Sequence, residues 1–145
     1  MYLEDIQINS EVTVENIVIE KEEMLDFAKR YNPAKIHTDE DFAKNTRFGG
    51  LIAPGMLSFL TVWAQYVSVD FAGEDLVAGK STAIEWLKPV FAGDILRGSA
   101  HVTGLSFRNE HNGIMTVTID VYNQKGEKVL TSIVESVVKR RPSSA

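Results

Sequence analysis

The sequence predicts an α+β domain in which an antiparallel sheet wraps around one long central helix. Three observations support this prediction. Residues 55–69 are apolar around nearly the whole helical circumference, which is typical of a helix buried on most sides. Four segments with strand patterns follow this helix, and no further helical pattern separates them. Short turn signals lie between these later segments, as expected for antiparallel hairpins.

Length and composition fit one soluble globular domain. The chain has 145 residues and no cysteine, which excludes a disulfide framework, a thiol nucleophile and a thiolate metal site. Its 15 basic and 20 acidic residues give a net charge of −5, so we expect no binding to nucleic acid or to an anionic membrane. The N-terminus lacks a signal-peptide pattern, and Pro54 and Gly55 interrupt the most apolar stretch. We therefore expect a cytoplasmic protein with a single domain at residues 1–140 and a polar tail at residues 141–145.

The first half of the chain predicts one strand and two short helices. The β-branched residues of segment 12–20 predict a strand, with a bulge at residues 15–16. Apolar residues at helical spacing predict a helix over residues 24–31 that ends before Pro33. Thr38 and Asp41 resemble a capping box, which predicts a second short helix that begins at Thr38 and ends near residue 44.

The second half begins with the long helix, in which Pro54 is expected in the first turn. Asn112-Gly113 and residues 123–126 have the composition of hairpin turns. The segment between these turns alternates apolar and polar residues, as in a strand with one buried face. The predicted strands cover residues 80–87, 94–108, 114–123 and 128–140.

Three histidines are the only side chains with an ordinary pKa near neutrality. His37 lies in a segment that we expect to be a loop between helices, where it is either a surface residue or a general acid or base. His101 is expected in a cross-strand surface pair, and His111 in a solvated turn. The spacing of these histidines matches no metal site, so we assign no metal.

Residues 47–56 lead with paired glycines into the long helix. The glycines either mark an ordinary loop or bring a ligand to the free backbone amides of the helix start, where an anion such as a developing enolate would be stabilised. The segment matches no P-loop and no dinucleotide-binding fingerprint. Ser58 follows but lacks a Gly-x-Ser-x-Gly elbow, so we do not expect a serine hydrolase.

Three motifs share an order and spacing that resemble a known family. They are N-P-A-K-I-H at residues 32–37, F-G-G-L-I-A-P-G-M at residues 48–56 and P-V-F-A-G-D at residues 89–94. Together they resemble the MaoC-like dehydratases, a hot-dog family that includes (R)-specific enoyl-CoA hydratases. The resemblance extends over nearly the whole chain and implies the hot-dog fold, a homodimer, and a cleft built at the subunit interface.

The resemblance also implies a chemistry and a set of site residues. A water molecule adds to, or leaves, the β-carbon of an acyl thioester, whose carrier is CoA or an acyl carrier protein, and no cofactor is needed. His37 matches the catalytic histidine, and Asn32 occupies the position of the family's catalytic aspartate. Gly55 and Met56 are implied to bind the substrate, with the Gly55 amide donating to the thioester carbonyl.

The chain departs from the family pattern at the aspartate. The motif Y-D-P-x-x-x-H of some branches becomes Y-N-P-A-K-I-H at residues 31–37, and an amide cannot accept a proton at neutral pH. Pro54 also replaces a histidine, which is a milder change. Asp39 and Asp41 are expected to serve the helix start rather than to replace the missing base.

Three functions remain open after this comparison of motifs. The first is a hydro-lyase of the enoyl-CoA hydratase type, weakened by Asn32. The second is a catalytically silent hot-dog protein that binds acyl-CoA as a sensor or carrier. The third is a hot-dog thioesterase, which requires a carboxylate on the central helix, where residues 58–65 contain none. The sequence leaves the acyl chain length and the choice between CoA and acyl carrier protein open.

Overall fold

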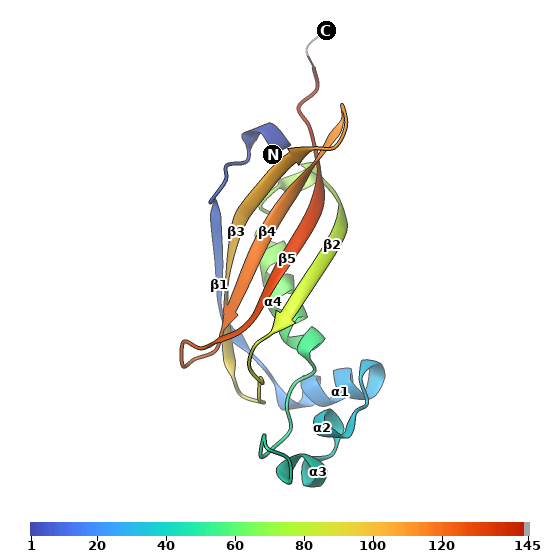
Figure 1. Ribbon diagram of the computed structural model, residues 1–145, viewed down its shortest axis with the longest axis vertical. Coiled ribbons are helices and arrows are strands. Elements are labelled where there is room, and N and C mark those ends of the chain that lie inside the picture. The colour runs from blue at the N-terminus through green and yellow to red at the C-terminus, as the bar shows by residue number, and fades with distance from the viewer. Residues whose placement is uncertain (144–145) are drawn as a thin grey trace.

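The computed structural model describes residues 1–143, in which a five-stranded antiparallel sheet carries one long helix on one face (Figure 1). The strands lie in the order β1-β3-β4-β5-β2, so β1 and β2 form the two edges. Both the predicted class, α+β, and the antiparallel pairing are confirmed. The strand bounds are β1 Glu11–Val18, β2 Leu76–Trp86, β3 Ile95–Phe107, β4 Asn112–Tyr122 and β5 Lys128–Lys139.

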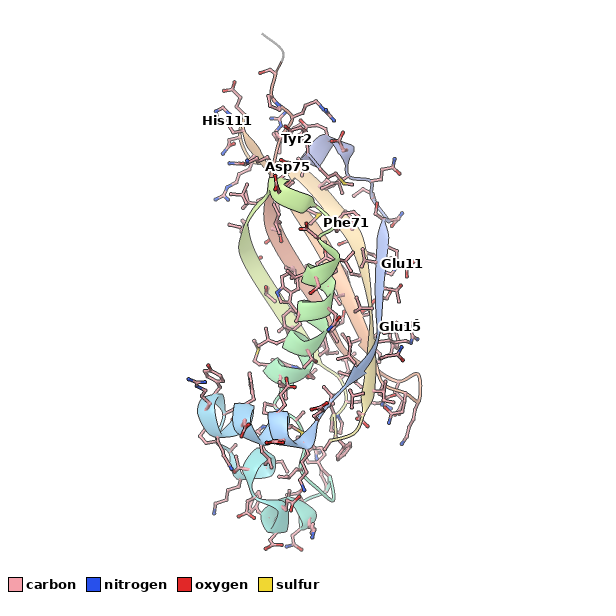
Figure 2. The ribbon with its side chains drawn as sticks, turned by 180° about the vertical axis from the view of Figure 1, so that it is seen from behind. Tyr2, Glu11, Glu15, Phe71, Asp75 and His111 are labelled. Carbon is pink, nitrogen blue, oxygen red and sulfur yellow. The ribbon has the colours of Figure 1, made fainter. Side chains whose placement is uncertain are left out.

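The helices divide into one long helix against the sheet and a group of short ones beyond its end. Helix α4 (Gly55–Val69) crosses the sheet face and is seen in front of the strands in Figure 2. The short helices α1 (Lys21–Tyr31), α2 (Lys35–Thr38) and α3 (Glu40–Lys44) lie together beyond one end of the sheet (Figure 1). Two 3₁₀ turns complete the described elements, η1 (Leu3–Asp5) and η2 (Gly73–Asp75). Among residues 1–143, no helix has the length and apolar character needed to cross a membrane.

Helix α4 is buried on one side only. A Cβ at Gly98 of β3 would lie 2.5 Å from Val62 Cγ1, so the glycine allows the helix and the sheet to approach closely. The opposite side of the helix is open, and the expectation of burial on most sides is therefore correct only for the face toward the sheet. The large exposed apolar side chains of α4 are Met56, Leu60, Val67 and Val69.

The N-terminal elements confirm some predictions and correct others. The register between β1 and β3 shifts between Val14 and Ile17, and Asn16 has φ 59°, so the predicted bulge is confirmed. The predicted cap at Thr38 is wrong, because Thr38 ends α2. Helix α3 is capped instead by Asp39, whose Oδ1 accepts a hydrogen bond from the Phe42 amide at 3.0 Å.

One hairpin turn lies elsewhere than predicted. Asn112 and Gly113 are the first residues of β4 and not a turn, because the side-chain oxygen of Asn109 accepts the amides of His111 and Asn112 at 2.9 and 2.8 Å and so closes the turn before them. The turn at residues 123–126 is confirmed by the bond from the Gly126 amide to the Asn123 carbonyl and by the φ of 75° at Gly126.

Several element bounds also differ from the predictions. Strand β2 begins at Leu76, four residues before the predicted start. Its first residues, up to Gly79, already pair with β5, although the register is irregular there. Pro54 precedes the first helical residue of α4 as its N-cap. The Arg141 amide, in the predicted tail, donates to Glu4 at 2.9 Å, whereas residues 144–145 lie outside the described residues.

Candidate active site

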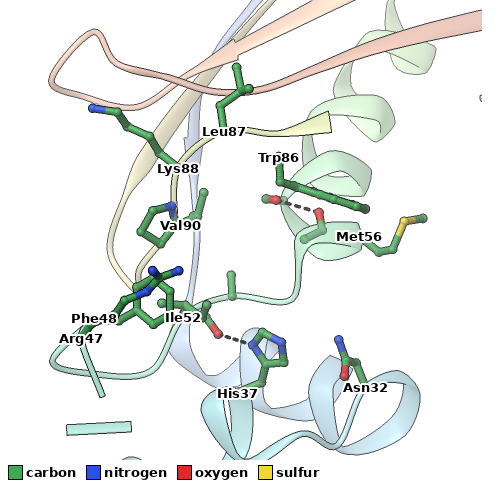
Figure 3. Close-up of a pocket in the computed structure, with 14 residues that line it drawn as sticks. Asn32, His37, Arg47, Phe48, Ile52, Met56, Trp86, Leu87, Lys88 and Val90 are labelled. Atoms are coloured by element: carbon green, nitrogen blue, oxygen red, sulfur yellow. Dashed lines mark hydrogen bonds between the residues drawn. The ribbon is translucent and has the colours of Figure 1, made fainter. Parts of the chain in front are cut away.

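A cavity of about 410 Å³ lies beside the N-terminus of α4, between the short helices and the end of β2 (Figure 3). All four residues that the sequence predicts for the site, Asn32, His37, Gly55 and Met56, line this cavity. They come from α2, from the C-terminal end of α1 and from the first turn of α4. The fold thus brings together residues that are up to 24 positions apart, and it leaves His101 and His111 outside the cavity lining.

His37 is held by a backbone contact. It lies in the one-turn helix α2, not in a loop as predicted, and its side chain is buried. Its Nδ1 is 2.7 Å from the carbonyl oxygen of Ile52. Because a carbonyl only accepts hydrogen bonds, Nδ1 carries the hydrogen, and in the neutral imidazole Nε2 is left as an acceptor. Figure 3 shows this second nitrogen turned away from Ile52.

The support of His37 is a short extended segment, Leu51–Ala53. The Ile52 amide donates to the Ile36 carbonyl at 3.3 Å, and the Ala53 amide donates to the Val90 carbonyl at 2.7 Å. Ile52 also pairs antiparallel with Phe91. Main-chain hydrogen bonds therefore connect the segment to α2 on one side and to residues 90–91 on the other.

Asn32 is placed by the end of helix α1. Pro33 disfavours helical backbone at the preceding residue, and Asn32 accordingly leaves the helix with φ −156° and ψ 75° while its amide still donates to the Ala28 carbonyl. Its side-chain amide points into the cavity beside the ring of His37 (Figure 3). An amide at this position can orient a water molecule through its donor and acceptor atoms, but it cannot remove a proton.

The first turn of α4 presents backbone amides to the cavity. The amides of Leu57 and Ser58 donate to the Pro54 carbonyl, whereas those of Gly55 and Met56 precede any partner within the helix. The positive end of the helix dipole adds to their attraction for negative charge. The buried Ser58 hydroxyl donates to the Gly55 carbonyl at 2.7 Å and so is engaged inside the helix. The free amides of Gly55 and Met56 can therefore stabilise an oxyanion.

Gly55 also makes room for an aromatic ring. A Cβ at this position would lie 2.4 Å from Trp86 Cε2. At this distance the two atoms would overlap, so the Trp86 ring would have to move. Trp86 ends β2, and its ring lies across the helix start beside Met56 (Figure 3). The glycine therefore allows the close approach of the indole ring to the helix start.

The sequence reasoning missed the charged rim of the cavity. Arg47 and Lys88 both line it, and its lining residues within the described chain include no carboxylate. Each cation directly precedes one of the three motifs, Arg47 before Phe48 and Lys88 before Pro89, and this adjacency is the signal that the sequence contains for them. Within residues 1–143, no cluster of three or more His, Asp or Glu residues has the geometry to hold a metal ion.

A family model with the description "MaoC like domain" matches residues 5–123. The chain belongs to the MaoC-like family. A solved structure from Archaeoglobus fulgidus, a monoamine oxidase regulatory protein, superposes with a TM-score of 0.93 at 30% identity and covers 98% of this chain and 96% of its own. The curated protein YdeM of Bacillus subtilis, which is uncharacterized, is 28% identical over 141 residues, or 97% of this chain and all of YdeM. The resemblance to MaoC-like proteins and the hot-dog fold are thereby confirmed.

Two further matches of this MaoC-like chain have hydratase names. The (R)-hydratase of A. caviae involved in PHA biosynthesis superposes with a TM-score of 0.72 at 25% identity, over 94% of this chain and 98% of its own. The mesaconyl-CoA hydratase of Cereibacter sphaeroides is 41% identical over 61 residues, which are 41% of this chain and 18% of that enzyme. Hydratases are thus among the relatives of this MaoC-like chain.

Proposed function

We propose that the protein is a hydro-lyase that adds water to, or removes it from, the β-carbon of an acyl thioester. The observation that carries this proposal is His37, buried beside the helix start, with Nδ1 bonded to the Ile52 carbonyl at 2.7 Å and Nε2 left as a proton acceptor. An acceptor of this kind beside two free backbone amides is the minimum that the reaction requires: a base for water and donors for the enolate.

The proposed steps use three groups of the cavity. Asn32 orients a water molecule, and His37 Nε2 removes a proton from it as the water oxygen bonds to the β-carbon. The electron pair of the C=C bond forms a double bond between the α-carbon and the carbonyl carbon, and the carbonyl π pair moves to the oxygen. The amides of Gly55 and Met56 stabilise this enolate oxygen. The imidazolium of His37 then returns the proton to the α-carbon. His37 carries both proton transfers in this scheme, because the Asn32 amide can carry neither.

The experiment is a hydration assay of crotonyl-CoA on the wild type and three variants. We expect turnover by the wild type and a decrease of about 10²–10⁴-fold on His37→Ala, which is the usual contribution of general acid–base catalysis. His101→Ala, which alters a half-buried histidine of β3 outside the cavity lining, is the matched control and should retain activity. We expect Asn32→Asp to raise the rate. Equal activity in the wild type and His37→Ala would refute the proposal.

A second candidate function is a silent binder of acyl thioesters. Asn32 at the position of the family's aspartate favours it, together with a cavity lining that includes no carboxylate within the described residues. This candidate predicts tight binding of crotonyl-CoA without turnover in the wild type and the appearance of turnover in Asn32→Asp. A thioesterase ranks below both, because α4 contains no Asp or Glu.

We also propose that the working unit is a homodimer paired through β2. This strand forms one edge of the sheet, bonds to β5 on its inner side, and has ten of its eleven residues exposed. A long unprotected edge of this kind is suited to pairing with a second copy. Sedimentation equilibrium should give about twice the chain mass of 16.1 kDa, and a mass equal to that of one chain would reject the dimer.

A further inference from the structure

The rim of the active-site cavity has charge of one sign. Its two charged lining residues are Arg47 and Lys88, in a protein whose net charge is −5. Another surface hollow, over α1, has the opposite character, with four acidic residues in its lining: Glu20, Glu22, Glu23 and Asp26. Cations concentrated at the mouth of one cavity in an acidic protein indicate that the ligand of this cavity carries negative charge.

Arg47 is positioned for an external anion. Its guanidinium carbon lies 4.9 Å from the ring centroid of Phe48, so the planar cation rests on an aromatic face. None of the ion pairs within residues 1–143 includes Arg47. A stacked guanidinium keeps its edge N–H groups available, and these match two oxygens of a phosphate in a bidentate contact.

Lys88 has a different position. Its Nζ is 2.5 Å from Glu127 Oε2, so a carboxylate from the turn between β4 and β5 already occupies one side of the ammonium group. The charge of Lys88 is therefore offset by this pair, whereas Arg47 is the rim cation that has no ion-pair partner within residues 1–143.

The opposite wall of the cavity is apolar. Met56 and Trp86 lie side by side there, and both are about half exposed, at 45% and 47%. Figure 3 shows Arg47 and Phe48 across the cavity from these two side chains. A ligand with an anionic end and an apolar end can therefore match the cavity in one orientation only.

We propose that Arg47 binds a phosphate group of the carrier to which the acyl chain is attached. This inference rests on the proposed function, and it orients the substrate with its carrier at Arg47 and its acyl chain toward Met56 and Trp86. CoA and the prosthetic group of acyl carrier proteins share a phosphate on pantetheine, and CoA has further phosphates on its nucleotide. The shared chemistry is thus a phosphate ester of a pantetheine thioester.

The test measures binding of three unreactive saturated ligands: butyryl-CoA, butyryl-phosphopantetheine and butyryl-pantetheine. Calorimetric Kd values are compared for the wild type, Arg47→Ala, and Arg108→Ala as a control at an exposed arginine outside the cavity lining. Arg47→Ala should weaken butyryl-CoA about tenfold or more, the usual worth of a hydrogen bond to a charged group. It should also reduce the salt dependence of binding and leave butyryl-pantetheine unchanged.

The ligand series also identifies the phosphate. If butyryl-phosphopantetheine weakens as much as butyryl-CoA, Arg47 binds the phosphate that both carriers share. If only butyryl-CoA weakens, Arg47 binds the phosphates of the nucleotide, and CoA is the carrier.

Three results would overturn the inference: no binding of butyryl-CoA by the wild type, an equal loss for all three ligands, or an equal effect of Arg108→Ala. The hydration of crotonyl-pantetheine by the wild type separates this inference from the proposed function. Turnover of that phosphate-free substrate combined with any of the three results would leave the hydro-lyase standing and remove the phosphate site.

Discussion

His37 Nδ1 and the carbonyl oxygen of Ile52 are 2.7 Å apart, and this contact selects the tautomer of the imidazole. The hydrogen on Nδ1 leaves Nε2 with a lone pair. Tautomer selection through a backbone carbonyl is an established way to fix the direction in which a histidine accepts a proton.

We expect nuclear magnetic resonance to report this tautomer directly. In a mildly alkaline sample, where imidazoles are neutral, long-range ¹H–¹⁵N correlations of His37 should show a protonated Nδ1 and an unprotonated Nε2. The exposed His111 provides the reference, with the mixture of tautomers typical of a solvated ring. A His37 spectrum with hydrogen on Nε2 would remove the acceptor from the proposed reaction.

Gly55→Ala should impair catalysis more than stability. The new Cβ would lie 2.4 Å from the Trp86 ring, which is half exposed and can swing away, so we expect a change of about 1 kcal/mol in the free energy of unfolding. The displaced ring should enter the space beside the first-turn amides and lower kcat/KM at least tenfold.

The displacement can be followed by fluorescence in a Trp63→Phe background, where Trp86 is the only tryptophan. Its emission maximum should shift on Gly55→Ala. Gly50→Ala is the matched control, because its Cβ would meet no atom within 4 Å. Full activity of Gly55→Ala would show that the cavity tolerates the moved ring.

Gly98→Ala should destabilise the fold. Its Cβ would lie 2.5 Å from Val62 Cγ1 and 3.2 Å from Val14 Cγ2, and Val62 is fully buried. Overpacking of this kind destabilises by about 1–3 kcal/mol, which urea denaturation can measure. Gly79→Ala, on β2 with no atom within 4 Å, should change the free energy of unfolding little. In the double variant that combines Gly98→Ala with Val62→Ala, the loss of unfolding free energy should be smaller than the sum of the losses in the two single variants.

Glu127 should titrate below its ordinary value. The hydrogen bond from Lys88, followed by that from Asn123, lowers the pKa of this carboxyl below 4.5. The folded state therefore binds the proton less tightly than the unfolded state, so the contribution of the pair is present above the unfolded pKa and is lost as the pH falls through the folded pKa. Because the Glu127 side chain is partly exposed at the surface, solvent screens the pair and the effect on stability is small.

Carbon NMR of the side-chain carboxyls can measure this pKa. Lys88→Ala should return the pKa of Glu127 toward 4.5, whereas Lys125→Ala, which removes a more weakly coupled neighbour, should change it less. An unchanged titration in Lys88→Ala would mean that the ion pair between Lys88 and Glu127 does not persist in solution.

The motifs were sufficient to identify four residues that line one cavity, but they did not reveal the local structure of these residues. His37 was expected in a loop because the four-residue helix α2 is too short to show a hydrophobic period. The turn before β4 was misplaced because the Asn109 side chain forms it, and the Asn-Gly pair that follows has a stronger local signal.

Contacts between distant segments were not predictable from one sequence. Trp86 and Lys88 reach the cavity only because β2 ends beside the start of α4, an approach that depends on the pairing of β2 with β5. Likewise, the apolar circumference of α4 does not reveal how many of its sides the sheet covers. The exposed side chains of that helix appear only when the sheet has been assembled.

The extended segment at residues 51–53 holds His37 in place independently of the residues that form the cavity rim. Backbone hydrogen bonds fix it to Ile36 and Val90, so the position of the His37 imidazole does not depend on the side chains around the rim. Rim residues such as Arg47 and Trp86 can then be exchanged while the imidazole stays in place. The cavity thus combines a fixed histidine with an interchangeable entrance, and it is a practical starting point for changing which ligands bind.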